Sequence, residues 1–443
     1  MIKGEKMKKK KIDDIEIIDE EKPKKKLKRK TLLLLLIPLL VVGGVIGFIV
    51  INNQNKQKKL EEEKKLLEEI KSHYGEYVKV TKKTSLLVKK DDKYEEEIMV
   101  YPDVLLELDE LDPSVDMKYF KLKNNDYYID YHNVEKDAKE ESNNRYKNYI
   151  PFNENIITKD NFTLYDGEKE AFSFTKSMEF PIIINDYENK YYIEYHNKLL
   201  NISKDDVKET KKASNTEKKN QSKITTFAYH QVEDEGVKCK DLYVCINKDS
   251  FDKEMKYLKD NNYFTLTMEE LYMYLNGNIQ VDKGIVLTFD DGYKAKSTIE
   301  ILEKYDLMGT IFVITKSFDN MDIFKSNNLF VQSHTNNMHR NYVCPGGSQG
   351  GAILCASEKE IKDDLKLSIE KTGEEPWAMA YPFYDYNEKA VKAVKDVGFK
   401  MSFVGRAGVM GKATPKVTNL YKIPRMTVWD PSIMSFSDWK SYL

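Results

Sequence analysis

The stretch GIVLTFDDG, residues 284–292, indicates the fold of the C-terminal half of this 443-residue chain. Its first six residues are mostly apolar or β-branched, which is typical of a short strand buried inside a sheet. The run ends abruptly in Asp290, Asp291 and Gly292. We therefore predict a buried strand whose carboxyl end presents two carboxylates.

Six more apolar segments of this kind lie between residues 224 and 443, and stretches with helical periodicity separate several of them. The other predicted strands are 224–232, 309–315, 329–335, 377–383, 401–405 and 423–428. The predicted helices are 295–305, 358–372 and 387–397. Short strands that alternate with helices imply a parallel sheet with helical crossovers. We therefore predict an α/β fold, an incomplete (β/α) barrel of about seven parallel strands, with its chemistry at the carboxyl ends of the strands.

Two histidines accompany the predicted strand 329–335. His334 lies at its end, and His339 comes five residues later, after a turn-prone Asn-Asn pair. Five residues rotate by about 500° on a helix, so a turn rather than a helix must bring both rings to one site. Two imidazoles and one carboxylate are a common ligand set of hydrolytic metal sites. Each piece alone is more often a turn, a surface group or a core group, and only the ordered combination favours a metal.

The two adjacent carboxylates need different roles, because neighbours on a strand point to opposite faces. One can bind the metal while the other takes a proton from water. For this, the strand exit at Gly292 must turn both side chains towards one site.

Four short segments of the C-terminal half carry a family resemblance. They are Thr288-Phe289-Asp290-Asp291-Gly292, Ser333-His334-Thr335-Asn336-Asn337-Met338-His339, Ala380-Tyr381-Pro382-Phe383 and Ile423-Pro424-Arg425. Together they resemble the polysaccharide deacetylase (NodB-homology) family, also called carbohydrate esterase family 4. The first two segments are specific and the last two are weak. The five-residue histidine offset and the pair Tyr229-His230 are similar to the branch that acts on poly-N-acetylglucosamine.

The resemblance implies a role for each matching residue of the domain 224–443. Asp290 would be the general base. Apart from the resemblance, Arg425 is a candidate to orient Asp290 by a charge-assisted hydrogen bond, with an ordinary surface ion pair as the alternative. No histidine follows His339, so His230 would be the general acid, with a purely structural role as the alternative. The metal would be a divalent ion, with zinc expected, held by Asp291, His334 and His339. The reaction would be hydrolysis of N-acetyl groups on N-acetylhexosamine units, releasing acetate.

The N-terminal region predicts a membrane anchor. Residues 31–51 contain no charged side chain, and their 21 residues suffice to cross a hydrocarbon core about 30 Å thick. The basic run KPKKKLKRK precedes them, so residues 1–30 would be a cytoplasmic basic tail and the rest of the chain would lie outside the cell. A cleaved signal peptide is the alternative; its apolar region would be shorter, with a small-residue cleavage site. We expect a single-pass protein of the cell membrane with an extracellular catalytic domain.

The middle of the chain contains an internal repeat. YYIDYHN at 127–133 returns as YYIEYHN at 191–197, amid alternating apolar and aromatic residues. The expected parts are a helical stalk at 52–72, two β-rich modules at 73–140 and 141–207 that loosely resemble SH3-like barrels, and a flexible linker at 208–223. The repeated histidines, His132 and His196, are expected to share one structural role.

The four cysteines form two local pairs in the sequence. We predict the disulfides Cys239–Cys245 and Cys344–Cys355, formed in an oxidising compartment, with four unpaired thiols as the alternative. The second would restrain the glycine-rich segment 340–357, which we interpret as a lip over the substrate groove.

The partner implied by these features is an N-acetylglucosamine-containing polysaccharide of the cell envelope, either an exopolysaccharide or peptidoglycan. An O-acetyl esterase acting on a glycan would use the same metal ligands, and an inactive glycan-binding scaffold is an alternative of another class. Net charge is −2, and the strong basic block lies beside the predicted membrane helix. The sequence therefore does not favour a nucleic-acid partner.

Overall fold

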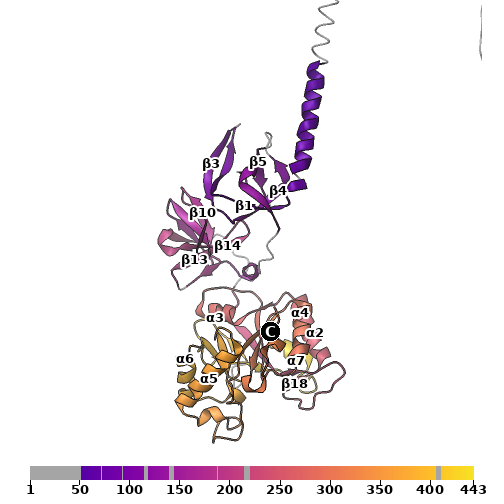
Figure 1. Ribbon diagram of the computed structural model, residues 1–443. Helices are drawn as coiled ribbons and strands as arrows, with labels where there is room; N and C mark the ends of the chain where they lie inside the picture. The colour runs from indigo at the N-terminus through magenta and orange to yellow at the C-terminus, as the bar shows by residue number, and fades with distance from the viewer. Residues whose placement is uncertain are drawn as a thin grey trace, which may run out of the picture. The chain divides into compact units, whose positions relative to one another are not determined.

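The structure is a computed structural model that describes residues 51–70, 72–91, 93–113, 118–138, 144–186, 188–213, 220–405 and 411–443. The chain divides into two compact units, Met1–His73 and Tyr74–Leu443 (Figure 1). In the first unit, residues 51–70 are helical. The predicted tail 1–30 and, apart from Ile51, the predicted membrane helix 31–51 lie outside the described residues. No helix among the described residues has both the length and the apolar character needed to span a membrane.

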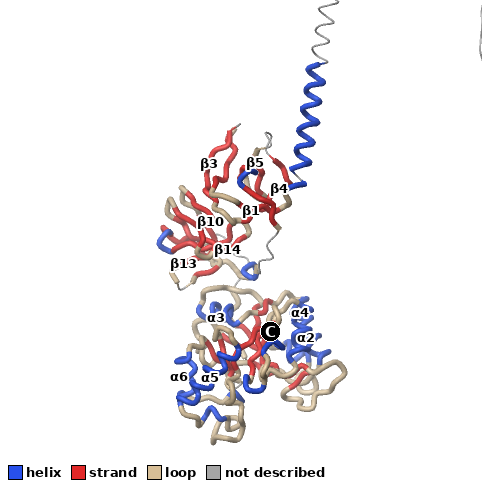
Figure 2. Tube along the Cα trace, in the orientation of Figure 1, coloured by secondary structure: helices blue, strands red, loops and turns tan. Residues whose placement is uncertain are grey.

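A mainly parallel sheet forms the centre of the C-terminal domain, where its strands lie among the helices (Figure 2). The strand order is β24-β23-β22-β21-β20-β16. These strands are β16 (Ile224–Tyr229), β20 (Gly284–Phe289), β21 (Gly309–Val313), β22 (Leu329–Ser333), β23 (Ala378–Ala380) and β24 (Met401–Phe403). β26 (Met426–Thr427) adds a parallel strand beside β16, and β19 (Phe264–Thr265) pairs with β20. The predicted α/β class and the parallel sheet are confirmed.

The segment before β26 connects the two edges of this sheet. Ile423 forms a parallel bridge with Phe403 of β24, whereas β26, three residues later, pairs with β16. The segment passes from one edge strand to the other, so only two residues of the predicted strand 423–428 are a strand in the structure. Antiparallel β25 (Lys412–Ala413) also pairs with β16. A further parallel pair, β17 (Gln231–Val232) with β18 (Cys245–Ile246), follows β16.

Helices pack around the strands (Figure 1). They are α2 (Lys248–Asp260), α3 (Met268–Asn276), α4 (Ala295–Tyr305), α5 (Glu358–Thr372), α6 (Glu388–Val397) and α7 (Phe436–Lys440). The bounds of α4 and α5 are those predicted. α5 begins at a capping box between Ser357 and Glu360 and ends at Gly373, whose φ is 67°, so both ends carry signals that a sequence can show.

The β-rich part of the chain forms one continuous sheet of twelve strands and a smaller sheet of three. Its first group of strands is β1 (Tyr77–Val80), β2 (Thr84–Lys90), β3 (Lys93–Val100), β4 (Leu105–Pro113), β5 (Tyr119–Leu122), β6 (Tyr127–Asp130) and β7 (Val134–Asp137). Its second is β8 (Glu154–Thr158), β9 (Phe162–Asp166), β10 (Lys169–Phe174), β11 (Glu179–Pro181), β12 (Ile184–Asn185), β13 (Lys190–Tyr195), β14 (Lys198–Ser203) and β15 (Val207–Lys212). The two groups meet where β3 pairs with β10. The likeness of the modules to SH3-like barrels stays a prediction.

The two copies of the sequence repeat do not have the same structure. His132 lies in a 3-10 turn after β6 and is exposed. His196 lies in the turn between β13 and β14, with a φ of 49°, and its ring stacks on Phe172 at 5.2 Å. Burial lowers the pKa of His196 to about 4. The expectation of a shared structural role was therefore wrong, because two heptapeptides that differ at one position span a strand and a 3-10 turn in one copy and a strand and a hairpin turn in the other.

The described ends of the predicted linker 208–223 make backbone hydrogen bonds. Its first residues belong to β15, which pairs with β8. At the other end, Gln221 donates from its backbone N–H to the carbonyl of Val281 at 2.8 Å. The side chains of β15 are mostly exposed, so this strand depends on backbone hydrogen bonds and leaves no apolar pattern in the sequence.

Candidate active site

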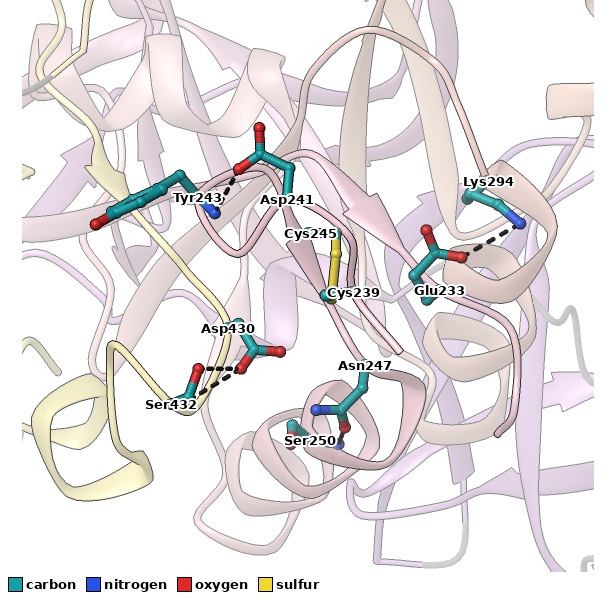
Figure 3. Close-up of a disulfide and its surroundings, with 10 residues drawn as sticks. All are labelled: Glu233, Cys239, Asp241, Tyr243, Cys245, Asn247, Ser250, Lys294, Asp430 and Ser432. Atoms are coloured by element: carbon teal, nitrogen blue, oxygen red, sulfur yellow. Dashed lines mark hydrogen bonds and ion pairs between the residues drawn. A yellow bond between two sulfur atoms is a disulfide. The ribbon is translucent and has the colours of Figure 1, made fainter. Parts of the chain in front are cut away.

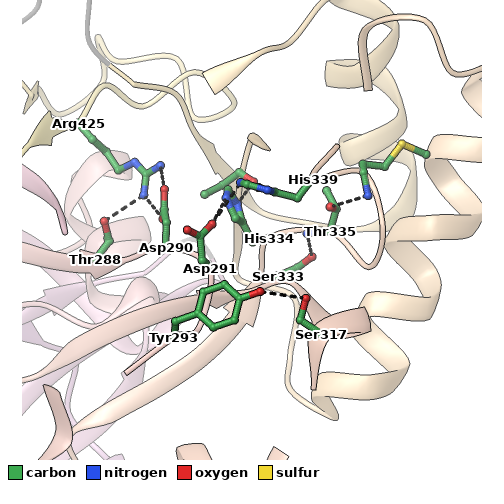
Figure 4. A network of polar contacts seen from close by, with 12 residues as sticks. Thr288, Asp290, Asp291, Tyr293, Ser317, Ser333, His334, Thr335, His339 and Arg425 are labelled. Carbon is green, nitrogen blue, oxygen red and sulfur yellow. Dashed lines mark hydrogen bonds and ion pairs between the residues drawn. The ribbon is translucent and has the colours of Figure 1, made fainter. Parts of the chain in front are cut away.

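Asp290 follows β20 directly and is fully buried beside Arg425 (Figure 4). The guanidinium donates from Nη1 to Oδ1 and from Nη2 to Oδ2 of Asp290, and Nη1 also donates to Thr288 Oγ1 at 3.1 Å. The guanidinium lies over the rings of Phe312 and Phe403, 5.5 and 5.7 Å from their centroids. Arg425 lies in the segment that passes from β24 to β16, and this course places its guanidinium against the end of β20.

Asp291 lies next to Asp290 but reaches the same site through an unusual backbone. Its φ is 73°, and Gly292 follows with a φ of 97°. Left-handed backbone is costly for a residue other than glycine. In an extended strand, Asp290 and Asp291 would point to opposite faces. The left-handed backbone turns the Asp291 carboxylate from that direction, so both carboxylates face one cavity.

Three side chains form a candidate metal centre. Their ligand atoms all lie within 4.8 Å of one another, and the residues are Asp291, His334 and His339. Asp291 Oδ1 is 3.6 Å from His334 Nε2 and 3.2 Å from His339 Nε2. His334 Nδ1 lies 2.8 Å from the carbonyl oxygen of Ala380. If Nδ1 donates to that carbonyl, Nε2 carries the lone pair that a metal requires.

The turn that carries the two histidines is held by α5. Asp364 accepts backbone hydrogen bonds from Asn336 and Asn337, each at 2.8 Å. Thr335, with a φ of 69°, begins the turn, and its hydroxyl accepts the N–H of Met338 at 3.2 Å. The turn-prone pair Asn336-Asn337 thus separates the histidines as predicted, and Asp364 fixes its shape.

Electrostatics at the site favour cation binding. Burial opposes ionisation of Asp290, but the charge of Arg425 outweighs it and holds the pKa of Asp290 below its usual value. Burial also opposes ionisation of Asp291, but the close approach of His339 and the other imidazoles outweighs it and lowers the pKa of Asp291. Burial lowers the pKa of His334 to about 4. The site therefore presents ionised carboxylates and a neutral imidazole, the protonation states in which these groups bind metals.

His230 follows β16 and lines the same cavity as the other predicted site residues. Its Nδ1 atom is buried and has no hydrogen-bond partner in the described part of the chain. The structure thus brings His230, Asp290, Asp291, His334 and His339 to one cavity, with Arg425 behind Asp290.

The cavity has a volume of about 1340 Å³. This exceeds the roughly 300–1,000 Å³ of sites for drug-sized ligands, so it has room for several sugar rings. Its aromatic lining residues are Tyr243, Phe383, Tyr384, Tyr386 and Trp429.

Both predicted disulfides, Cys239–Cys245 and Cys344–Cys355, are formed. The second closes part of the predicted lip, from which Ser348 and Gln349 line the cavity.

Sequence reasoning missed Asp385, which holds this lip. Its carboxylate accepts the backbone N–H groups of Ser348, Gln349 and Gly351, and the Ser348 hydroxyl at 2.9 Å. Tyr384, the residue after the third family segment, adopts a left-handed φ of 62°. Its hydroxyl lies 3.1 Å from Thr427 Oγ1.

The family model described as "Polysaccharide deacetylase" matches residues 277–402. This range includes Asp290, Asp291, His334 and His339 and excludes His230 and Arg425.

Two curated proteins are similar to the chain over about 200 residues. "Putative polysaccharide deacetylase YxkH" of Bacillus subtilis is 28% identical over 195 residues, covering 41% of this chain and 65% of that protein. The Staphylococcus epidermidis "Poly-beta-1,6-N-acetyl-D-glucosamine N-deacetylase" is 23% identical over 203 residues, covering 41% of this chain and 68% of that protein. The alignment with the first thus spans just under two thirds of its length.

Among solved structures, the "Streptococcus pyogenes deacetylase PplD in complex with acetate" is 24% identical, with a TM-score of 0.42. The match covers 50% of this chain and 97% of that one.

Proposed function

Since the chain belongs to the polysaccharide deacetylase family through its C-terminal domain, we propose that this domain is a metal-dependent N-deacetylase. Its substrate would be an N-acetylglucosamine-containing polysaccharide of the cell envelope. The observation that carries the proposal is the meeting of Asp291, His334 and His339 beside a buried, ionised Asp290 in one large cavity.

The ligand set fits a divalent cation. Asp291 Oδ1 is buried and accepts no hydrogen bond from the described residues, although it faces two imidazole nitrogens. A buried carboxylate oxygen in that position requires a compensating partner, which a cation would provide. Two nitrogens and one oxygen with room for solvent suit Zn²⁺, which we expect as the cofactor. When bound, such an ion polarises a carbonyl and makes water more acidic.

The protein side chains would then move the protons. Asp290 accepts a proton from the attacking water at a carboxylate oxygen, and Arg425 keeps that carboxylate in place through two hydrogen bonds. Water oxygen bonds to the acetyl carbon, the carbon–nitrogen bond breaks, and the leaving nitrogen needs a proton to depart as an amine. His230 lines the cavity with an imidazole that can supply this proton. The products are acetate and an amino sugar.

The substrate class is proposed from a relative and from the size of the cavity. One similar protein is named as a deacetylase of poly-β-1,6-N-acetyl-D-glucosamine, and a cavity of about 1340 Å³ suits a polymer rather than a small ester. Membrane anchoring through residues 31–51 and an extracellular catalytic domain remain parts of the proposal. The two disulfides support it, because disulfides persist mainly in oxidising compartments.

The test uses the full chain, purified in detergent, stripped of metal by a chelator and then reloaded with Zn²⁺. We expect acetate release from β-1,6-linked N-acetylglucosamine oligomers only after reloading, and none from the Asp290→Asn variant with zinc bound. Peptidoglycan is assayed beside the oligomers to identify the polymer.

Two results would overturn the proposal. Release from O-acetylated xylan alone would assign the alternative O-acetyl esterase activity. Oligomer binding without any acetate release, from protein with one zinc ion per chain, would assign a glycan-binding scaffold.

A further inference from the structure

A small loop at the rim of the cavity presents an exposed aromatic ring. The loop is closed by the disulfide Cys239–Cys245, and its Tyr243 is 60% exposed. The ring meets Trp429 edge to face, with centroids 5.8 Å apart and an interplanar angle of 77°. Both side chains line the cavity that contains the candidate metal centre. An exposed tyrosine thus lies against a partly buried tryptophan at the cavity.

The loop is built to hold this ring in place. The backbone N–H of Tyr243 donates to Asp241 Oδ1 at 3.0 Å, and the carbonyl of Leu242 accepts the N–H of Asp430 at 3.0 Å. Asp430 is fixed in turn by the N–H and hydroxyl of Ser432, at 3.0 and 2.7 Å. Figure 3 shows the Tyr243 ring pointing away from the disulfide that closes the loop. A ring held by its backbone in this way loses little conformational freedom when a ligand binds.

The two rings stand on the segments that flank His230. The N–H of Gln231, the residue after His230, donates to the carbonyl of Val244 at 3.0 Å. On the other side, the N–H of Val428 donates to the carbonyl of Ala228 at 2.9 Å. Tyr243 directly precedes Val244, and Trp429 directly follows Val428. The segments that carry the aromatic pair are therefore hydrogen-bonded to residues one and two positions from His230, and all three side chains line the same cavity.

We propose that Tyr243, supported by Trp429, is a sugar-stacking subsite for a ring that neighbours the sugar being deacetylated. This inference rests on the proposed function and extends it to substrate length. A pyranose presents an apolar face of C–H groups, and aromatic rings offer flat apolar surface of matching size at low entropic cost. Binding at such a neighbouring site would favour polymer chains over single sugars.

The experiment compares substrates of two lengths on the full zinc-loaded chain. The substrates are an N-acetylglucosamine monomer and the β-1,6-linked pentamer, and the measured quantity is the ratio of their kcat/KM values. We expect Tyr243→Ala to lower the pentamer-to-monomer ratio about tenfold, the order of effect of a well-placed aromatic contact. Tyr243→Phe keeps the ring and is expected to restore most of the ratio.

The matched control is Leu242→Ala. Leu242 lies in the same disulfide loop, is 38% exposed, and does not line the cavity. This substitution leaves the Leu242 carbonyl and its hydrogen bond to Asp430 in place, and it is expected not to change the ratio. Calorimetric titration of Asp290→Asn with the pentamer, with and without Tyr243→Ala, measures binding apart from turnover.

The outcomes separate this inference from the proposed function. An active wild-type chain whose pentamer preference and pentamer affinity both survive Tyr243→Ala would overturn the subsite alone. A wild-type chain that releases no acetate from either substrate would overturn the proposed function. The calorimetric comparison would still show whether Tyr243 binds sugar.

Discussion

The Arg425 guanidinium donates two hydrogen bonds to Asp290, from Nη1 to Oδ1 at 2.7 Å and from Nη2 to Oδ2 at 2.8 Å, and both side chains are buried. The pair joins residues 135 positions apart. Breaking a buried ion pair by removing one partner leaves a charge without compensation, which typically costs about 3–5 kcal/mol.

We therefore expect Arg425→Met to lower the free energy of unfolding by about 3–5 kcal/mol and to abolish acetate release. In the double variant with Asp290→Leu, no charge stays buried, and most of the stability should return. The measurement is urea unfolding followed by tryptophan fluorescence, since Trp377, Trp429 and Trp439 all lie in the C-terminal domain. Strictly additive losses in the double variant would show that the two side chains are not coupled.

The turn between the histidines depends on the Asp364 carboxylate. Asp364→Asn replaces one of the two acceptor oxygens for Asn336 and Asn337 by a donor. We expect zinc affinity to fall about 10- to 100-fold, as for other groups that orient metal ligands. Competition with a chromogenic chelator measures the affinity. Asp363→Asn is the control, because Asp363 is exposed and pairs only with Lys359 among the contacts described. Equal affinities for the two variants would refute a role for Asp364 in holding the turn.

Substitutions of His230 and His339 should have different effects, one on proton transfer and the other on metal binding. His230→Gln is expected to keep one zinc ion per chain while kcat falls about 10²- to 10⁴-fold, the usual contribution of a general acid. His339→Gln should lose the metal itself, because His339 Nε2 is one of the three clustered ligand atoms. Metal content by atomic emission and acetate release are measured on the same samples. Full activity in His230→Gln would assign the histidine a structural role only.

The lip closed by Cys344–Cys355 should affect substrate binding more than chemistry. Asp385→Ala leaves the N–H groups of Ser348, Gln349 and Gly351 without their acceptor. We expect faster hydrogen exchange in residues 344–355 and a KM raised severalfold. The paired substitution of both cysteines by serine should act in the same direction. An unchanged KM in both variants would exclude the segment from the substrate groove.

Glu254 should make stability depend on pH. Burial raises the pKa of Glu254 to about 8, although Tyr229 donates to its carboxylate at 2.9 Å. The folded state therefore holds a proton that the unfolded chain releases near pH 4.5. The contribution of Glu254 to the free energy of unfolding is fully present below pH 4.5. It is lost as the pH rises from there towards 8, by about 1.4 kcal/mol per pH unit.

Glu254→Gln should remove this decline, so the variant gains stability over the wild type between pH 5 and 8. Urea midpoints measured across that range test the prediction. The control is Asp260→Asn, which replaces an exposed carboxylate on the same helix. If the urea midpoints of the wild type and of Glu254→Gln changed with pH in the same way, the prediction would be wrong.

The sequence predicted those parts of the fold whose signals are local. Helices α4 and α5 have the predicted bounds, because apolar periodicity and, for α5, end caps are written into a few neighbouring residues. His230, Asp290, Asp291 and His334 were found because they follow the buried strands β16, β20 and β22. That Asp290 and Asp291 both reach the cavity depends on a left-handed φ at Asp291, for which Gly292 was only an indirect sign.

Long-range partners could not be predicted in the same way. Asp364 and Asp385 are ordinary acidic residues in the sequence, and their roles arise from backbone groups 27 to 37 residues away. The sequence repeat led to a wrong prediction for His132 and His196. The two local sequences are nearly the same, but local sequence alone does not determine where each strand ends. Strand β15 was missed because its pairing with β8 relies on backbone groups, which every sequence carries.

The strand-to-strand crossing at Ile423–Thr427 has a consequence for the order in which a newly made chain acquires its abilities. The candidate metal ligands all lie between residues 291 and 339, whereas the segment that joins β24 to β16 and carries Arg425 is synthesised some 85 residues later. If the proposed function holds, a growing chain would thus complete its set of metal ligands before Arg425 holds Asp290 in place. Contacts of such long sequence separation form late in folding, so hydrolytic competence should be the last property that the domain gains.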